Sequence, residues 1–180
     1  MQDEQHVEGR LGLAHLALQQ ERHAEAVRQS QQAISTAETG THKAYWSPLI
    51  AYTNLGLAHY EQQEYEAAHK AFEKAVEAKP NHAIAHYHLG LVAFAQRDLP
   101  GAEEHYRRTL TINPDDFHAR SNLAVAVLHQ GRAAECAELL EPLMVTHPDD
   151  VTNLTNYGSA LLVLQRFSEA LPVFEHLVEL

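Results

Sequence analysis

The sequence predicts an all-α protein built from repeated helical hairpins, because three kinds of position recur with one period. Proline recurs at a constant interval, at Pro80, Pro114 and Pro148. A leucine or tyrosine followed directly by glycine or alanine recurs at 55–56, 89–90, 123–124 and 157–158. A small residue followed four places later by a large apolar one recurs at 68–72, 102–106, 136–140 and 170–174. A fixed period of roughly 20 to 50 residues is typical of folds that stack one supersecondary unit repeatedly.

Each recurring position has a physical role in a helical hairpin. A small residue such as Gly56 lets the two helices of a hairpin approach closely, and a large one such as Phe72 fills the space between neighbours. The proline cannot continue a helix, so it ends the second helix of each hairpin and sets up the turn into the next.

The first copy, over residues 7–40, is the least regular. Its segment LAHLALQQERHAEAV (13–27) aligns with residues 55–69. The step from position 13 to position 55 is longer than the regular step of the later copies, such as the one from Pro80 to Pro114. The excess means that about eight residues are inserted between the first two copies.

The insert spans about 40–48 and contains Trp46, the one tryptophan of the chain. Gly40 is suited to ending a helix, and the pair Ser47-Pro48 is suited to starting the next one. We expect a lengthened helix and a packed loop in this region. A dedicated binding loop is the alternative.

The remaining copies run over residues 49–82, 83–116, 117–150 and 151–180. The last of them ends at Leu180, before its closing proline and with an apolar final helix. A terminal repeat normally carries a polar outer face or a capping helix. Either the sequence is part of a longer protein, which we favour, or this end packs against another surface.

Residues 52–80 resemble the tetratricopeptide repeat, a helix–turn–helix unit with the pattern W-x₂-L-G-x₂-Y, then A-x₃-F, then P. The matching positions are Tyr52 in place of the tryptophan, Leu55, Gly56, His59, Ala68, Phe72, Ala75 and Pro80, with Tyr65 at a common aromatic position. The resemblance implies a single array over residues 1–180, a right-handed superhelix of about five hairpins.

Composition excludes several classes of function. The chain has 24 acidic and 13 basic residues and a net charge of −11, so nucleic acid is not an expected partner. It has no run of about eighteen apolar residues that could span a membrane, and its first residues lack the apolar core of a signal peptide. A single cysteine rules out an intramolecular disulfide. We expect a soluble, cytoplasmic protein.

No group of residues predicts catalysis. Among the 14 histidines, His82 and His86 lie one helical turn apart, but no third ligand stands at a matching spacing unless His118 of the next repeat approaches them. Cys136 occupies a small-residue position, which indicates a buried and inert thiol. Phosphate-loop and hydrolase motifs are missing from the sequence. We therefore predict a protein that is no enzyme and has no metal site and no cofactor.

The first helix of each repeat is expected to line a concave groove that binds a partner. The face opposite the packed Leu-Gly seam supplies the candidate residues Asn54, Leu57, Tyr60, Glu61, Tyr87, His88, Leu91, Phe94, Asn122, Val125, Leu128, His129, Asn156, Ser159, Leu162 and Val163.

Two columns stand out in this set. Asn54, Asn122 and Asn156 share one column, interrupted by His88; we expect these amides to face solvent, where they can bind a peptide backbone of any sequence. The column resembles the asparagine ladder of some family members, including O-linked N-acetylglucosamine transferases. The second column is an apolar stripe of Tyr60, Phe94, Leu128 and Leu162, which is typical of a partner site unless these residues pack on the next helix.

Chaperone-binding members of the family hold a C-terminal carboxylate with lysine and arginine beside the asparagine. One of the corresponding columns here holds Leu11, Thr53, Tyr87, Ser121 and Thr155, and the other holds Glu8, Ile50, Ile84, His118 and Thr152. Neither column contains lysine, so an acidic chaperone tail would find no counter-charge. We expect a neutral or basic partner instead.

The sequence thus predicts a non-enzymatic scaffold that binds an extended or helical segment of a partner protein in its groove. Two alternatives stay open. The chain could be the substrate-recruiting region of a larger enzyme such as a glycosyltransferase, or it could self-associate through its C-terminal repeat.

Overall fold

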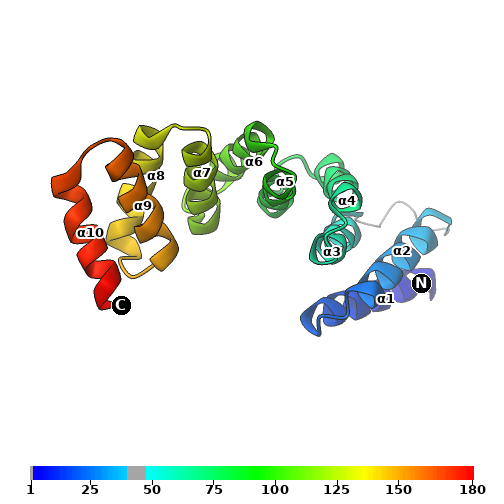
Figure 1. Ribbon diagram of the computed structural model, residues 1–180. Coiled ribbons are helices and arrows are strands. Elements are labelled where there is room, and N and C mark those ends of the chain that lie inside the picture. Colours follow the sequence, from blue (N-terminus) through cyan, green and yellow to red (C-terminus); the bar gives the residue numbers. More distant parts are fainter. Residues whose placement is uncertain (1, 40–47) are drawn as a thin grey trace. The chain divides into compact units, whose positions relative to one another are not determined.

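The computed structural model of the chain describes residues 2–39 and 48–180, and within these ranges it is helical throughout, without strands (Figure 1). Its helices are α1 (Gln2–Gln19), α2 (His23–Thr39), α3 (Pro48–Glu61), α4 (Tyr65–Ala78), α5 (Ala83–Ala95), α6 (Leu99–Ile112), α7 (Phe117–His129), α8 (Ala133–Thr146), α9 (Val151–Val163) and α10 (Phe167–Glu179). The all-α fold class is therefore confirmed for this part of the chain. The right-handed superhelix stays a prediction.

The turn inside each hairpin contains one residue with a left-handed backbone conformation. These residues are Glu21 (φ 57°), Gln63 (φ 61°), Arg97 (φ 66°), Gly131 (φ 80°) and Gln165 (φ 58°). They repeat with the period of the sequence, including the longer step between the first two. The turns therefore show that the irregular first copy folds as a hairpin of the same kind as the others.

The start of three helices is capped by an aspartate side chain. The carboxylate of Asp98 accepts a hydrogen bond from the amide of Gly101 at 3.1 Å, and Asp116 and Asp150 cap α7 and α9 in the same way. Such a cap contributes about 1 kcal/mol to helix stability. Helices α4, α6 and α8 each end two residues before a periodic proline, as the sequence predicts.

The helices form two compact units, Met1–Gln96 and Arg97–Leu180, which are described separately. In the first unit each helix packs on the next, and α3 also contacts α1 and α5. In the second unit consecutive helices again pack together from α6 onward, and α7 also contacts α9. The boundary falls between α5 and α6, inside the third copy of the repeat. The single array predicted for residues 1–180 therefore stays a prediction.

The core of the first unit shows why a glycine is needed after the periodic leucine. Ala68, Phe72, Leu89 and Val92 form one buried cluster. A Cβ atom added to Gly56 would lie 2.6 Å from Cε1 of the Phe72 ring, which is inside the distance of any real contact. The absence of a side chain at Gly56 is therefore what allows α3 and α4 to close on each other.

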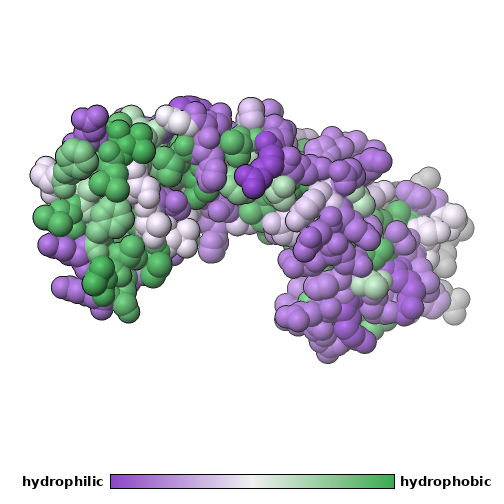
Figure 2. Space-filling model, viewed as in Figure 1, coloured by the Kyte–Doolittle hydropathy of each residue, from purple (hydrophilic) through white to green (hydrophobic). Residues whose placement is uncertain are grey.

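The second unit repeats this packing less tightly at its last hairpin. A Cβ atom added to Gly158 would lie 2.6 Å from the Phe174 ring, but this ring is only half-buried. The exposed side chains of Phe167, Leu171 and Val178 lie on the same helix, α10. Figure 2 shows hydrophobic surface over α9 and α10.

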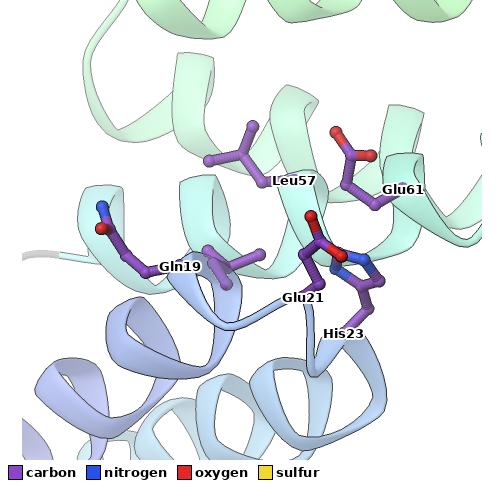
Figure 3. A pocket seen from close by; sticks show the side chains of 6 residues that line it. Gln19, Glu21, His23, Leu57 and Glu61 are labelled. Carbon is purple, nitrogen blue, oxygen red and sulfur yellow. The ribbon is translucent and has the colours of Figure 1, made fainter.

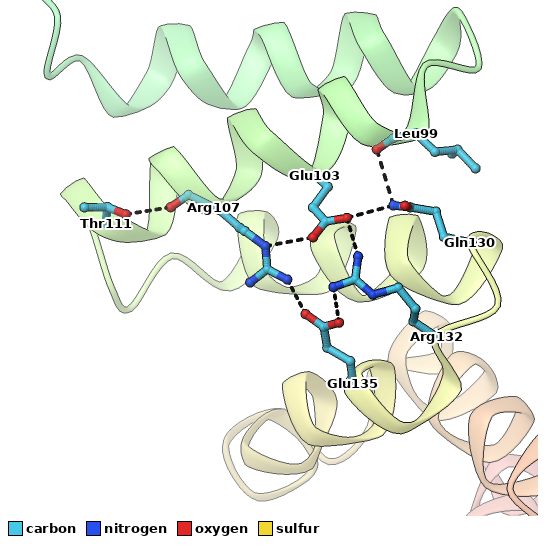
Figure 4. Close-up of polar contacts among 7 residues, drawn as sticks. All are labelled: Leu99, Glu103, Arg107, Thr111, Gln130, Arg132 and Glu135. Atoms are coloured by element: carbon cyan, nitrogen blue, oxygen red, sulfur yellow. Dashed lines mark hydrogen bonds and ion pairs between the residues drawn. The ribbon is translucent and has the colours of Figure 1, made fainter.

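An ion-pair network joins α6 to the turn between α7 and α8 (Figure 4). The Glu103 carboxylate accepts hydrogen bonds from Arg107 at 2.9 Å, Gln130 at 2.9 Å and Arg132 at 2.6 Å. Both arginines also bind the Glu135 carboxylate. Burial alone would raise the pKa of the Glu103 carboxyl, but the hydrogen bonds from Arg132, Arg107 and Gln130 together hold that pKa below its ordinary value.

Two further sequence predictions concern the insert and the absence of a membrane span. The insert with Gly40 and Trp46 lies outside the described residues, although Pro48 is the first residue of α3, as expected. No helix within 2–39 or 48–180 has the length and hydrophobicity needed to cross a membrane.

Candidate functional site

The candidate groove residues lie on the first helices of the hairpins, as the sequence predicts. Asn54, Leu57 and Tyr60 lie on α3, and Tyr87, His88, Leu91 and Phe94 lie on α5, all in the first unit. Asn122, Val125, Leu128 and His129 lie on α7, and Asn156 and Leu162 lie on α9, in the second unit. The set is therefore split between the two units, and each half is described by itself.

Asn54 differs from its expected solvent-facing position, since its exposed fraction is 6%. Its Nδ2 atom is buried and has no hydrogen-bond partner among the described residues. Helix α3 contacts α1, α2, α4 and α5, so a residue that the helical period places opposite the Leu-Gly seam can still be buried. Asn122 and Asn156 are half-buried, so they are closer to the expected arrangement.

His88 interrupts the asparagine column and belongs to the core of the first unit. Its ring stacks on Phe72 with centroids 5.1 Å apart and an interplanar angle of 9°, and Tyr87 contacts it edge-on. Burial, with a smaller effect of His82, lowers the pKa of His88 to about 4. His88 is therefore a neutral, packed aromatic residue at neutral pH.

The apolar stripe is partly core and partly surface. Tyr60 packs against the cluster around Phe72, with its ring 5.9 Å from Tyr65 and 6.5 Å from His88. Phe94 and Leu128 are half-buried, while Leu162 is 47% exposed. The alternative interpretation of the stripe, packing on neighbouring helices, thus applies to Tyr60 and not to Leu162.

The other candidates offer apolar contact surface. Leu57, Leu91 and Val125 are half-buried, and Leu57 packs against the Phe72 cluster. His129, at the end of α7, is exposed. These residues leave part of each side chain accessible on the first-helix faces.

A pocket of about 610 Å³ lies next to the candidate residues of α3 (Figure 3). It is lined by Leu18, Gln19, Glu21, His23, Leu57 and Glu61. Figure 3 shows these side chains contributed by the end of α1, the following turn, the start of α2, and α3. The pocket therefore lies entirely within the first unit.

Three polar side chains of this pocket, those of Glu21, Glu61 and His23, have polar atoms without a partner in the described part of the chain. Neither the Glu21 nor the Glu61 carboxylate has an ion-pair partner among the described residues. The Nδ1 atom of His23 is buried and also lacks a hydrogen-bond partner there. Carboxylates carry negative charge at neutral pH, so the pocket presents two uncompensated charges beside the apolar side chains of Leu18 and Leu57.

Sequence reasoning included Leu57 and Glu61 but missed the four pocket residues from the first hairpin. The signal was present, because the alignment of the first two copies places Leu18 opposite Tyr60 and Gln19 opposite Glu61. Extending the groove columns to the first copy would have found these two residues. Glu21 lies in the turn and His23 is the first residue of α2, and no groove column of the sequence marks them.

Of the histidine pair considered as metal ligands, His86 is held by a backbone contact. His86 is 8% exposed, and its Nε2 lies 2.9 Å from the carbonyl oxygen of Pro80. Within residues 2–39 and 48–180, no three side chains of the metal-binding types come together as a site. Cys136 is fully buried as predicted, and burial raises its pKa to about 11, so the thiol stays protonated at neutral pH.

Comparison with known proteins identifies the repeat. Three sequence models described as tetratricopeptide repeat match the chain, over residues 8–81, 53–117 and 93–156. A search of curated proteins gave no match.

Several solved structures share the fold. The chain is similar to the MamA protein, with 16% identity, a TM-score of 0.83, and coverage of 98% of this chain and 92% of that one. It is similar to YrrB, described as a TPR protein with an unusual peptide-binding site, with 19% identity, a TM-score of 0.79, and coverage of 94% and 84%. PilF of Pseudomonas aeruginosa gives 14% identity, a TM-score of 0.80, and coverage of 99% and 78%. Because the sequence identities are this low, these similarities show a shared fold and nothing more.

Proposed function

Because the chain belongs to the tetratricopeptide repeat family, we propose that it is a non-enzymatic interaction protein that binds a segment of a partner protein along its first-helix faces. The partner segment is extended or helical and neutral or basic. Binding uses side-chain amides for the peptide backbone and apolar side chains as anchors.

The observation that carries this proposal is the unpartnered amide of Asn54. A buried donor without an acceptor costs about 1 to 3 kcal/mol, and most buried polar groups in proteins are hydrogen-bonded. Asn54 is 6% exposed and its Nδ2 has no partner among the described residues. A rotation of the Asn54 side chain toward its exposed part would bring this donor to a peptide carbonyl lying on α3, and the bound state would then recover this cost.

Three further findings support the same function. Within the second unit, Asn122 and Asn156 place amides at the same position on α7 and α9, so this unit offers two side chains for contact with a peptide main chain. YrrB, which shares the fold, is described as having a peptide-binding site. The net charge of −11 favours encounter with neutral or basic segments over acidic ones.

The test is quantitative capture of partner proteins by the full chain and by the variant Asn54→Ala/Asn122→Ala/Asn156→Ala. We expect the variant to lose the partners that the wild type retains. A matched control, Gln31→Ala/Gln165→Ala, removes two exposed amides away from these faces and should capture normally. Circular dichroism confirms that each variant is folded. Equal recovery of the same partners by the triple variant would contradict the proposal.

The exposed apolar side chains of α10 favour self-association as a second function. Phe167 and Leu171 are 60% and 59% exposed, and Val178 is 86% exposed. Light scattering over a concentration series tests this directly. Self-association predicts that the mean mass rises with concentration and that Phe167→Ser/Leu171→Ser abolishes the rise; a constant monomer mass for the wild type would contradict it.

A further inference from the structure

We propose that the pocket between the α1–α2 turn and α3 binds a long basic side chain, arginine or lysine, of the peptide segment that the first-helix face holds. This inference rests on the proposed function and specifies what the bound segment must contain. Nothing in the repeat pattern assigns a specificity to this position.

The shape and lining of the pocket fit such a side chain. Leu18, Leu57 and His23 are half-buried, whereas Gln19, Glu21 and Glu61 are exposed. The pocket therefore has an inner part of two leucines and a histidine, and a polar rim. Arginine and lysine have the same division, because their methylene stems pack on apolar surface while the charged head remains among polar groups.

Charge supports the same occupant. The carboxylates of Glu21 and Glu61 come from different hairpins and have no cationic partner among the described residues. Arg22 follows Glu21 in the chain but does not line the pocket. A guanidinium or ammonium group bound between the two carboxylates would form charge-assisted hydrogen bonds, which are stronger than neutral ones. An acidic side chain would be repelled, and an apolar one would leave the carboxylates uncompensated.

The position of the pocket sets the register of the bound segment. Asn54 and Glu61 lie seven residues apart on α3, which corresponds to about 10 Å along the helix axis. An extended peptide rises about 3.3 Å per residue. The basic residue should therefore lie about three residues from the residue whose carbonyl group contacts Asn54.

The test is selection of displayed random twelve-residue peptides by the full chain. The wild type should enrich peptides with arginine or lysine at one fixed position, and Glu21→Gln/Glu61→Gln should enrich peptides without this preference. For one enriched peptide, synthesised with arginine and with norleucine at that position, the arginine advantage should fall roughly five- to tenfold in the variant. The control Glu104→Gln/Glu138→Gln removes two exposed carboxylates of the second unit and should retain the preference.

The outcomes separate the two proposals. Enriched peptides without a basic preference, or a preference unchanged in Glu21→Gln/Glu61→Gln, would overturn the pocket assignment and leave the proposed function standing. If the wild type enriched no peptide, the proposed function would fail and this inference with it. Circular dichroism establishes that both variants are folded.

A second measurement uses a probe independent of any selected peptide. Acetyl-arginine amide titrated into the ¹⁵N-labelled chain should shift the backbone resonances of residues 18–23 and 57–61. Acetyl-norleucine amide should leave them in place. Equal shifts by both probes, or shifts confined to other residues, would contradict binding of a basic side chain in this pocket.

Discussion

In the second unit, the carboxylates of Glu103 and Glu135 bind the guanidinium groups of Arg107 and Arg132. In the first unit, the carboxylates of Glu21 and Glu61 face a pocket without a cationic partner among the described residues. Both units are built from the same helical hairpin. The difference therefore comes from side chains that the repeat leaves free to vary.

The buried asparagine side chains of the two units also differ, since the one in the second unit has a hydrogen-bond partner. Asn153 in the second unit is fully buried, and its Oδ1 accepts a hydrogen bond of 2.5 Å from the Ser121 hydroxyl, although its Nδ2 has no partner among the described residues. Asn54 in the first unit has no side-chain hydrogen bond within the described part of the chain, and a small part of it is exposed.

The same repeat can therefore serve structural support in one unit and ligand binding in the other. Polar groups that bind each other stabilise the fold and leave few donors or acceptors for a ligand. A polar group that is buried without a partner costs stability, and a ligand that supplies the partner recovers that cost. The first unit therefore presents the stronger case for binding, and the second for structural support.

The largest expected effect is at Asn153. Asn153→Ala would remove a buried hydrogen bond, leave the Ser121 hydroxyl without its acceptor and open a small cavity, so the free energy of unfolding should fall by about 3 kcal/mol. Urea unfolding followed by circular dichroism measures it. In a double-mutant cycle, Ser121→Ala should remove most of the additional cost. A loss below about 0.5 kcal/mol would mean that this bond does not stabilise the second unit.

The next effect compares packing at equivalent glycines. Gly56→Ala should destabilise the chain by about 2 kcal/mol, because the fully buried Phe72 ring has no room to move. Gly158→Ala should cost less than about 1 kcal/mol, since the half-buried Phe174 ring can shift and alanine favours the helix. Thermal and urea unfolding of the two variants provide the comparison. Equal losses of unfolding free energy in the two variants would contradict a packing difference between these hairpins.

A smaller effect depends on pH. Glu103 has a lowered pKa in the folded protein, so its stabilising effect is complete above the ordinary pKa of glutamate and is lost as the pH falls through the lowered value. Glu103→Gln should cost about 1 kcal/mol at neutral pH, and the difference should shrink between about pH 5 and about pH 3. Glu104→Gln, on the exposed side of the same helix, is the control. A difference that grows on acidification would contradict this assignment.

The sequence predicts the hairpins well because their causes are local and repeated. The periodic prolines end α4, α6 and α8, and the longer step between the first two copies returns in the left-handed turn residues Glu21 and Gln63. The small residue at Gly56 correctly predicts that two helices approach each other closely. Each of these features depends on residues within one hairpin.

The pairing of charges could not be predicted in this way. Glu61 and Glu103 both lie on helices, but Glu103 meets Arg132, which is 29 residues away in the sequence, and Glu61 meets a pocket formed with another hairpin. The burial of Asn54 likewise depends on four neighbouring helices around α3. A helical period gives the face on which a residue lies and does not give the distance to what covers that face.

If the first unit holds the Asn54 amide unpaired for a ligand, the free energy of unfolding of Asn54→Ala should show it. Removing a buried donor without an acceptor, and replacing asparagine by a better helix former, should raise this free energy by about 1 kcal/mol in the absence of any partner. The same variant should bind selected peptides more weakly than the wild type. A fall in the free energy of unfolding by about 1 kcal/mol or more would show that the Asn54 amide serves the fold, and would contradict the claim.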